Sequence, residues 1–180
     1  MPSNILLITM GGTIDALAYS EKEGEYPINA TMPDDSHALK AMENICSEIN
    51  LTSIAICNKD SKDLKTQDQE KLFQTIKNNS SDRIIVTIGT DRMCEIAQNI
   101  QNKHLNLGCP VIFTGAIWPL YNGDHSDGWN NLKQAAFSNP KLAPDIYIAM
   151  GDIFTPANQV KKDFENKIFI DTKNLTNHNV

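Results

Sequence analysis

The residues best suited to chemistry in this sequence stand directly after its short apolar runs. Five such places carry glycines, hydroxyl groups, carboxylates or a lysine, at 11–13, 60–63, 89–91, 114–116 and 151–152. A hydroxyl in this position usually caps a helix, as Thr90 and Asp91 would for the run that follows them. Where several such ends meet, glycines let backbone N–H groups turn toward a small anion or an oxyanion. The pattern favours a site for a small ligand.

The glycines of "ITMGGTID" (8–15) do not form a recognisable nucleotide-binding loop. A GxGxxG fingerprint is absent, and no Gly-Lys-Ser/Thr follows at the Walker A spacing. A phosphate- or nucleotide-binding α/β protein therefore stays a weak alternative. The cysteines stand apart from one another and from the histidines, at Cys46, Cys57, Cys94 and Cys109. We expect free thiols, and neither a metal site, a disulfide framework nor a cofactor.

Composition limits the partners. The chain has 180 residues, of which 41% are hydrophobic and 21% charged, with a formal net charge of −6. Excess negative charge argues against binding to nucleic acid or an anionic membrane. No run approaches the ~20 apolar residues of a membrane span, and the N-terminus lacks the basic region of a signal peptide. We expect a cytoplasmic protein.

Apolar runs that alternate with helical patterns predict the elements that position these residues. The runs 4–10, 51–57, 83–88, 110–115 and 145–150 are nearly continuous in apolar character, which is typical of strands covered on both faces. Helical spacing appears in 34–49, 66–79, 91–104 and 126–137, and Thr66 with Gln69 resembles a capping box. We predict one α/β domain over 1–180, a three-layer sandwich with a mostly parallel, doubly wound sheet.

Two segments lie outside this alternation. Residues 158–171 have the pattern of a short extended hairpin, and 172–180 that of a frayed tail. The charged segment 15–33 is long for a compact domain and directly follows Thr13. A loop of this length is often functional, so we predict that it is an active-site lid.

Blocks of the sequence resemble a known family. They are "ITMGGTID" (8–15), "KDSKDL" (59–64), "VTIGTDRMCEIA" (86–97), and "PVIFTGAIWP" (110–119) followed by "SDGWNNL" (126–132). In order and approximate spacing they are similar to bacterial-type L-asparaginases, whose hallmarks are a GGTI segment, a GTDTMEE-like segment and a TGAMRP block followed by SDG. The resemblance runs through 4–163 and covers the N-terminal domain of that family.

The resemblance implies a catalytic set. Thr13 matches the nucleophile, carried on a mobile loop that closes over the substrate, and Thr90 and Asp91 complete the site. Lys162, by its spacing after the "AM" strand, matches the lysine that forms a relay with them. A lysine acts as a base only where desolvation or its neighbours lower its pKa. The loop tyrosine of the family matches Tyr26.

Substrate contacts also follow from the resemblance. Ser61 matches the serine that holds the α-carboxylate of the substrate, and we place Lys62 beside it in the binding site. Thr90 and Asp91 contribute to binding as well, with Asp91 accepting the α-ammonium group. Tyr19 competes with Tyr26 for the role of loop tyrosine, because the loop aligns poorly. No metal ligand is implied.

Several departures from the family pattern predict altered specificity. Lys62 replaces a glutamine or small residue, Trp118 replaces the arginine of TGAMRP, and Ile88 stands where a histidine or similar residue often precedes GTD. Nothing in the sequence corresponds to the smaller C-terminal domain, which contributes to the substrate site of the partner subunit. The surface that such a domain covers would be exposed, so we expect a homo-oligomer, a dimer or higher.

The resemblance implies an amidohydrolase that converts L-asparagine to L-aspartate and ammonia through a threonine acyl-enzyme. A second possibility is an amidase acting on glutamine or another small amide. A third is a non-catalytic module that keeps the amino-acid pocket to sense or sequester its ligand. The expected partner is a small-molecule amino-acid substrate or ligand, or another small amide in the second case.

Overall fold

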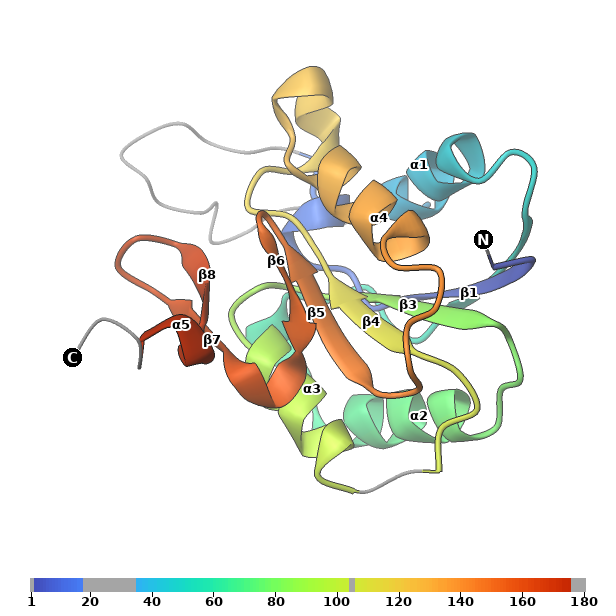
Figure 1. Cartoon of the computed structure of the whole chain (residues 1–180). Helices are drawn as coiled ribbons and strands as arrows, with labels where there is room; N and C mark the ends of the chain where they lie inside the picture. Colours follow the sequence, from blue (N-terminus) through green and yellow to red (C-terminus); the bar gives the residue numbers. More distant parts are fainter. Residues whose placement is uncertain (1, 18–34, 104–105, 176–180) are drawn as a thin grey trace.

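A twisted sheet of six strands forms the centre of the protein. The structure, a computed structural model, describes residues 2–17, 35–103 and 106–175. The strands are β1 (Asn4–Thr9), β2 (Asn50–Ala55), β3 (Arg83–Thr87), β4 (Val111–Thr114), β5 (Ile146–Met150) and β6 (Ile153–Pro156). Their order is β2-β1-β3-β4-β5-β6, and all neighbours are parallel except β6, which runs antiparallel to β5 (Figure 1). The predicted mostly parallel sheet is confirmed.

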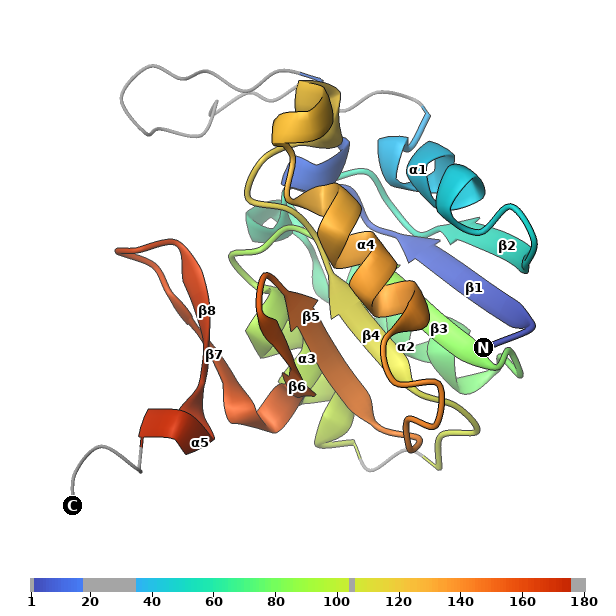
Figure 2. The same ribbon diagram turned by 45° about the horizontal axis from the view of Figure 1, so that its top comes forward.

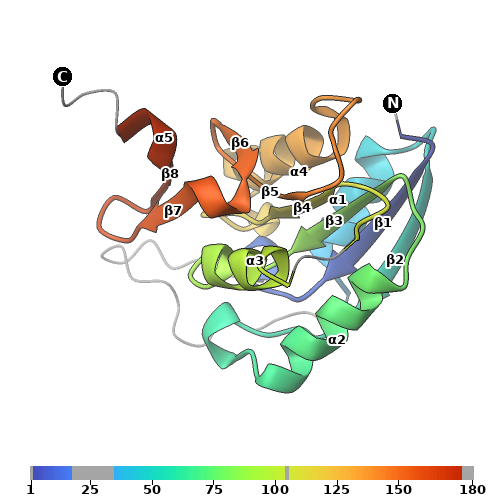
Figure 3. The ribbon, with the colours of Figure 1, turned by 60° about the horizontal axis from the view of Figure 1, so that its bottom comes forward.

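Helices cover both faces of this sheet. On one face lie α1 (His37–Ile45) and α4 (Gly128–Phe137), which Figure 2 brings forward. On the other lie α2 (Thr66–Lys77) and α3 (Met93–Gln101), in front of the sheet in Figure 3. The architecture is therefore the predicted three-layer sandwich in a single domain.

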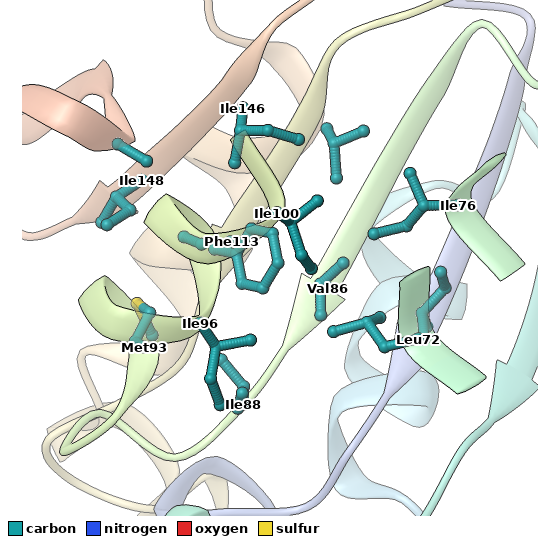
Figure 4. Close-up of a cluster of buried hydrophobic side chains, with 14 of the residues drawn as sticks. Leu72, Ile76, Val86, Ile88, Met93, Ile96, Ile100, Phe113, Ile146 and Ile148 are labelled. Carbon is teal, nitrogen blue, oxygen red and sulfur yellow. The ribbon is translucent and has the colours of Figure 1, made fainter. Parts of the chain in front are cut away.

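Alternating side chains of the buried strands divide the core into two clusters. Ile5 and Leu7 of β1 pack in the cluster with α1 and α4, whereas Leu6 and Ile8 pack in the cluster with α2 and α3. Figure 4 shows the second cluster, in which side chains of α2 and α3 meet those of β3, β4 and β5. Strands buried on both faces need apolar residues at every position, which explains why their runs are continuous.

Strand β2 is an exception to the prediction of two covered faces. Most of its residues are exposed, and Ile54 is 37% exposed. The strand lies at the edge of the sheet and pairs only with β1 among the described strands. The prediction was wrong here because an apolar run does not specify where its strand stands in the sheet. Strand β6 was missed altogether, since it is short and half-buried.

The helices are shorter than predicted, and two of their caps differ. At α2 the acceptor is Asp68, not Gln69: its Oδ2 accepts the backbone N–H of Lys65 at 2.8 Å, with Thr66 as the first helical residue. The N-cap of α3 is Arg92, without a side-chain cap, so Thr90 and Asp91 do not cap that helix. Their side chains are free for another role.

The C-terminal part forms the predicted hairpin. Strands β7 (Val160–Asp163) and β8 (Ile168–Asp171) pair antiparallel beyond the β6 edge of the main sheet (Figure 1). Where the sequence indicated a frayed tail, Thr172–Leu175 form one helical turn, α5. Of the predicted lid 15–33, only residues 15–17 lie among the described residues.

Arg83 is a buried cation at the start of β3. It is 2% exposed, and its guanidinium caps the C-terminal end of α4. Nη1 donates to the carbonyl oxygens of Ala135 and Ala136 at 2.8 Å each, and Nη2 donates to that of Asn139 at 3.0 Å. A cation here satisfies carbonyl groups that have no partner within the helix and complements the helix dipole.

Replacing Arg83 with methionine is expected to lower the free energy of unfolding by about 3 kcal/mol, because several buried carbonyls lose a charged donor. Urea denaturation measures this change. Lys133→Met on the exposed side of α4 removes the same charge and serves as the control. Equal stability of the two variants would contradict a capping role for Arg83.

Candidate active site

The site lies at β1, where successive strands are added on opposite sides of the same strand. β2 is placed outside β1, and the next strand, β3, returns to the other side of β1. The carboxyl ends of β1 and β3 are neighbours, with Thr9 opposite Thr87 in the register. In open α/β sheets, ligands bind at such a switch point. The segments 10–13 and 88–91 leave the sheet at this point.

Glycines allow the loops after the strands to touch one another. Gly11 and Gly12 have positive φ angles of 82° and 91°. A Cβ atom on Gly12 would lie 2.4 Å from the backbone nitrogen of Gly89, and one on Gly89 would lie 2.8 Å from Oγ of Ser61. No side chain fits at either contact, so Gly12 packs directly on the backbone of Gly89, and Gly89 packs directly against Ser61. Three strand-end loops are held together in this way.

This packing places Thr13 and Ser61 beside the loop of Thr90. Thr13 is half-buried and begins a 3-10 turn, η1 (Thr13–Asp15), directly after Gly12. Ser61 is 1% exposed and begins another, η3 (Ser61–Asp63), where it packs against Gly89. Thr13, the predicted nucleophile, and Ser61, which is predicted to hold the α-carboxylate of the substrate, thus flank one loop.

A lysine from the hairpin completes the cluster. Nζ of Lys162 donates to Oγ1 of Thr90 at 2.8 Å and to Oδ1 of Asp91. The side chain of Lys162 is 3% exposed, and Thr90 is 4% exposed. A buried amine between a hydroxyl and a carboxylate is the arrangement that proton transfer to or from a hydroxyl requires.

Asp91 is held by a second lysine. Its Oδ2 lies 2.8 Å from Nζ of Lys62, and the side chain of Asp91 is 23% exposed. Burial raises the pKa of Asp91, but hydrogen bonds from Lys162 and Lys62 outweigh burial and bring it below its ordinary value. Asp91 is therefore a carboxylate at neutral pH and remains one well into the acidic range.

The SDG block, which we recognised only as a motif, braces the loop after β4. Oδ1 of Asp127 accepts the backbone N–H groups of Ile117 and Trp118 at 3.0 and 2.8 Å. Nδ2 of Asn131 donates to the carbonyl oxygen of Gly115 at 3.0 Å. A Cβ atom on Gly115 would lie 3.6 Å from Cγ2 of Thr90. Asp127 and Asn131 thus fix a loop that borders the site.

Asp15 was also missed by sequence reasoning. It is 1% exposed, and its Oδ1 accepts hydrogen bonds from Oγ of Ser36 and the backbone N–H of Ala38, each at 2.9 Å. Ser36 is the N-cap of α1, so Asp15 ties the turn that carries Thr13 to this helix. Burial raises the pKa of Asp15 despite these hydrogen bonds.

The raised pKa of Asp15 predicts that this residue lowers the stability of the folded protein as the pH rises. Its contribution to stability is most favourable below the unfolded-state pKa of about 3.9 and falls as pH rises through the folded value. Asp15→Asn keeps an acceptor without charge, so its stability relative to the wild type should be higher at pH 7 than at pH 4.5. Asp15→Ala loses the acceptor and should cost about 1–3 kcal/mol. Urea denaturation at both pH values measures each variant, and an equal loss for both at pH 7 would contradict this account.

The structure does not describe every predicted site residue. Tyr26 and its competitor Tyr19 lie outside the described residues.

In the part of the chain that the structure describes, no three His, Cys, Asp or Glu side chains are grouped to hold a metal ion. None of the described helices has the length and apolar character of a membrane span. The described cysteines are all free: Cys46, Cys57, Cys94 and Cys109.

Comparison with known proteins gives a family match over most of the chain. A family model described as "Asparaginase, N-terminal" matches residues 4–168. No curated protein matches the sequence.

Solved structures share the fold. A probable cytoplasmic L-asparaginase from Campylobacter jejuni is 23% identical with a TM-score of 0.75, covering 94% of this chain and 53% of that one. L-asparaginase I from Vibrio cholerae is 21% identical with a TM-score of 0.74, covering 95% and 52%. The thermostable L-asparaginase from Thermococcus kodakarensis is 21% identical with a TM-score of 0.70, covering 93% and 51%. The chain spans about half the length of these structures.

Proposed function

Because the chain belongs to the asparaginase family through its N-terminal domain, matched over residues 4–168, we propose that it is an amidohydrolase. Its proposed reaction converts L-asparagine to L-aspartate and ammonia through a threonine acyl-enzyme. The observation that carries this proposal is the buried amine of Lys162 in contact with both Thr90 and Asp91. Those residues stand 72 and 71 positions away in the sequence, so the fold assembles the cluster.

The positions of the two threonines support different roles. Thr90 is 4% exposed and its hydroxyl is bonded to Lys162, which suits a relay. Thr13 is half-buried on the neighbouring loop, which suits a group that meets the substrate. We therefore propose Thr13 as the nucleophile, as the family resemblance implies.

The proposed reaction balances in two steps. Oγ of Thr13 attacks the amide carbon, the C–N bond breaks, and the hydroxyl proton passes through Thr90 and Lys162 to the departing nitrogen, which leaves as ammonia. Water then attacks the ester, the C–O bond to Thr13 breaks, and the proton returns to Thr13. Proton transfer by positioned groups contributes typically ~10²–10⁴-fold to the rate. The site residues proposed for substrate binding are Ser61, Lys62, Thr90 and Asp91.

An ammonia assay on the purified protein with L-asparagine tests the proposal, and L-glutamine in parallel tests the amidase alternative. We expect ammonia and aspartate in equal amounts. Titration calorimetry that shows amino-acid binding without release of ammonia from either amide would instead establish the non-catalytic binding module.

We propose in addition that the chain forms a homo-oligomer. Phe164 and Ile168, in the hairpin, are 64% and 52% exposed, and large apolar side chains at the surface are typical of interfaces. Ile168 also lines a cleft of about 610 Å³, together with Ile153 and Phe169. A monomer in sedimentation at micromolar concentration would contradict this proposal.

A further inference from the structure

Lys62 gives the proposed site an unusual distribution of charge. It follows the buried Ser61 on η3, and its side chain is 70% exposed. It reaches Oδ2 of Asp91 at 2.8 Å, while the buried Lys162 holds Oδ1. One carboxylate is thus bonded to a lysine through each of its oxygens.

Both carboxylate oxygens of Asp91 are already bonded to lysine amines, Oδ1 to Lys162 and Oδ2 to Lys62. Hydrogen bonding to Asp91 raises the pKa of Lys62 above its ordinary value, so Lys62 is an ammonium group at neutral pH. Two further acids lie close along the chain: Asp63 directly follows Lys62, and Asp60 accepts the backbone N–H of Lys62 at 2.8 Å. Both are exposed, where water screens their charge. The ammonium of Lys62 therefore shares its acid, Asp91, with Lys162.

The bonding of Asp91 to two lysines favours some ligands over others. An incoming ammonium group would compete with two lysine amines for Asp91 and would lie near the ammonium of Lys62, and like charges a few ångströms apart repel. An incoming carboxylate instead meets the ammonium of Lys62, which has three N–H donors and uses one on Asp91. An anionic ligand without an ammonium group fits the cluster better than a zwitterionic amino acid does.

We infer that the site selects a monoamide of a dicarboxylic acid that lacks the α-ammonium group, with succinamate as the four-carbon example. The inference rests on the proposed function for its chemistry, and the reaction is the same. Thr13 attacks the amide carbon, the C–N bond breaks with release of ammonia, and water frees succinate from the ester. Only the charge beside the reacting group differs from asparagine.

Kinetics of wild type, Lys62→Gln and Lys161→Gln with succinamate and L-asparagine test the inference. For the wild type, kcat/KM for succinamate should exceed that for asparagine by about tenfold, a ratio worth about 1.4 kcal/mol. Lys62→Gln should lower this ratio by about tenfold or more, because it weakens the binding of succinamate and leaves Asp91 able to accept an ammonium group. Lys161→Gln removes an exposed charge next to Lys162 and should leave the ratio unchanged. A wild type that prefers asparagine, with a ratio that Lys62→Gln does not alter, would overturn the inference.

Calorimetry with the products separates this inference from the proposed function. If no amide is hydrolysed, the proposed function fails, but the charge argument still predicts that succinate binds about tenfold more tightly than L-aspartate. Lys62→Gln should reverse that order. Tighter binding of aspartate to the wild type, or no binding of succinate, would contradict the charge argument itself.

Discussion

Replacing Thr13 with alanine is expected to reduce ammonia release by about 10⁴-fold or more, because the variant lacks the oxygen that would form the acyl-enzyme. Thr13→Ser keeps a hydroxyl and should retain measurable turnover. The fold should persist in both, since Thr13 is half-buried and heads only a short turn. Ammonia release under single-turnover conditions, with urea denaturation of each variant, provides the measurement.

The matched control is Thr75→Ala, which removes an exposed hydroxyl from α2. Its activity should equal that of the wild type. Mass spectrometry of acid-quenched enzyme then identifies the acylated peptide. An ester on the peptide with Thr90, or a Thr13→Ala variant as active as wild type, would transfer the nucleophile's role away from Thr13.

The layers of the fold could be predicted because each buried strand is apolar on both sides. The order of the strands could not. Residues 51–57 have the same apolar character as 83–88, yet the first becomes the exposed edge strand β2 and the second the buried strand β3. The apolar pattern of a strand indicates which of its faces can be buried. The position of the strand in the sheet depends instead on its pairing with distant segments.

Part of the candidate site could also be predicted, from the parallel arrangement of the strands. Loops that follow parallel strands meet at one sheet edge, so Thr13, Ser61 and Thr90 were expected to be neighbours. The glycines are expected to present N–H groups to a ligand, and their contacts show a second role, in packing. Gly12 and Gly89 let two backbones approach more closely than any side chain permits. Such an approach involves segments far apart in the sequence and leaves no local signal.

Choosing Lys162 over Lys161 needed the resemblance, because adjacent residues of a strand point to opposite sides. Lys161 is exposed, whereas Lys162 is turned toward Thr90 and Asp91. The carboxylates that brace the loops were not predicted as such. Asp15 and Asp127 act through backbone N–H groups of other segments, and the sequence does not show which N–H groups lie within reach.

Loss of the Lys162 amine is the second expected large effect. Lys162→Met should lower kcat by about 10²–10⁴-fold, the usual contribution of a group that moves a proton in the transition state. It also leaves Asp91 with Lys62 as its remaining ion-pair partner, so the pKa of Asp91 should rise toward its ordinary value. Since that lowered pKa contributes stability above the unfolded-state pKa of about 3.9, the variant should unfold more easily at pH 7 by about 2 kcal/mol.

Lys162→Arg separates catalysis from this stability. A guanidinium keeps a positive charge beside Asp91, so the free energy of unfolding should stay much closer to that of wild type than in Lys162→Met. It does not give up a proton at any pH the protein experiences, so it cannot carry the proposed relay, and kcat should fall as far as in Lys162→Met. Lys161→Met, which removes the exposed neighbour, should change neither quantity. An arginine variant that hydrolyses its amide at the wild-type rate would show that Lys162 acts only as a counter-ion for Asp91, and the proton would then have to move by another route.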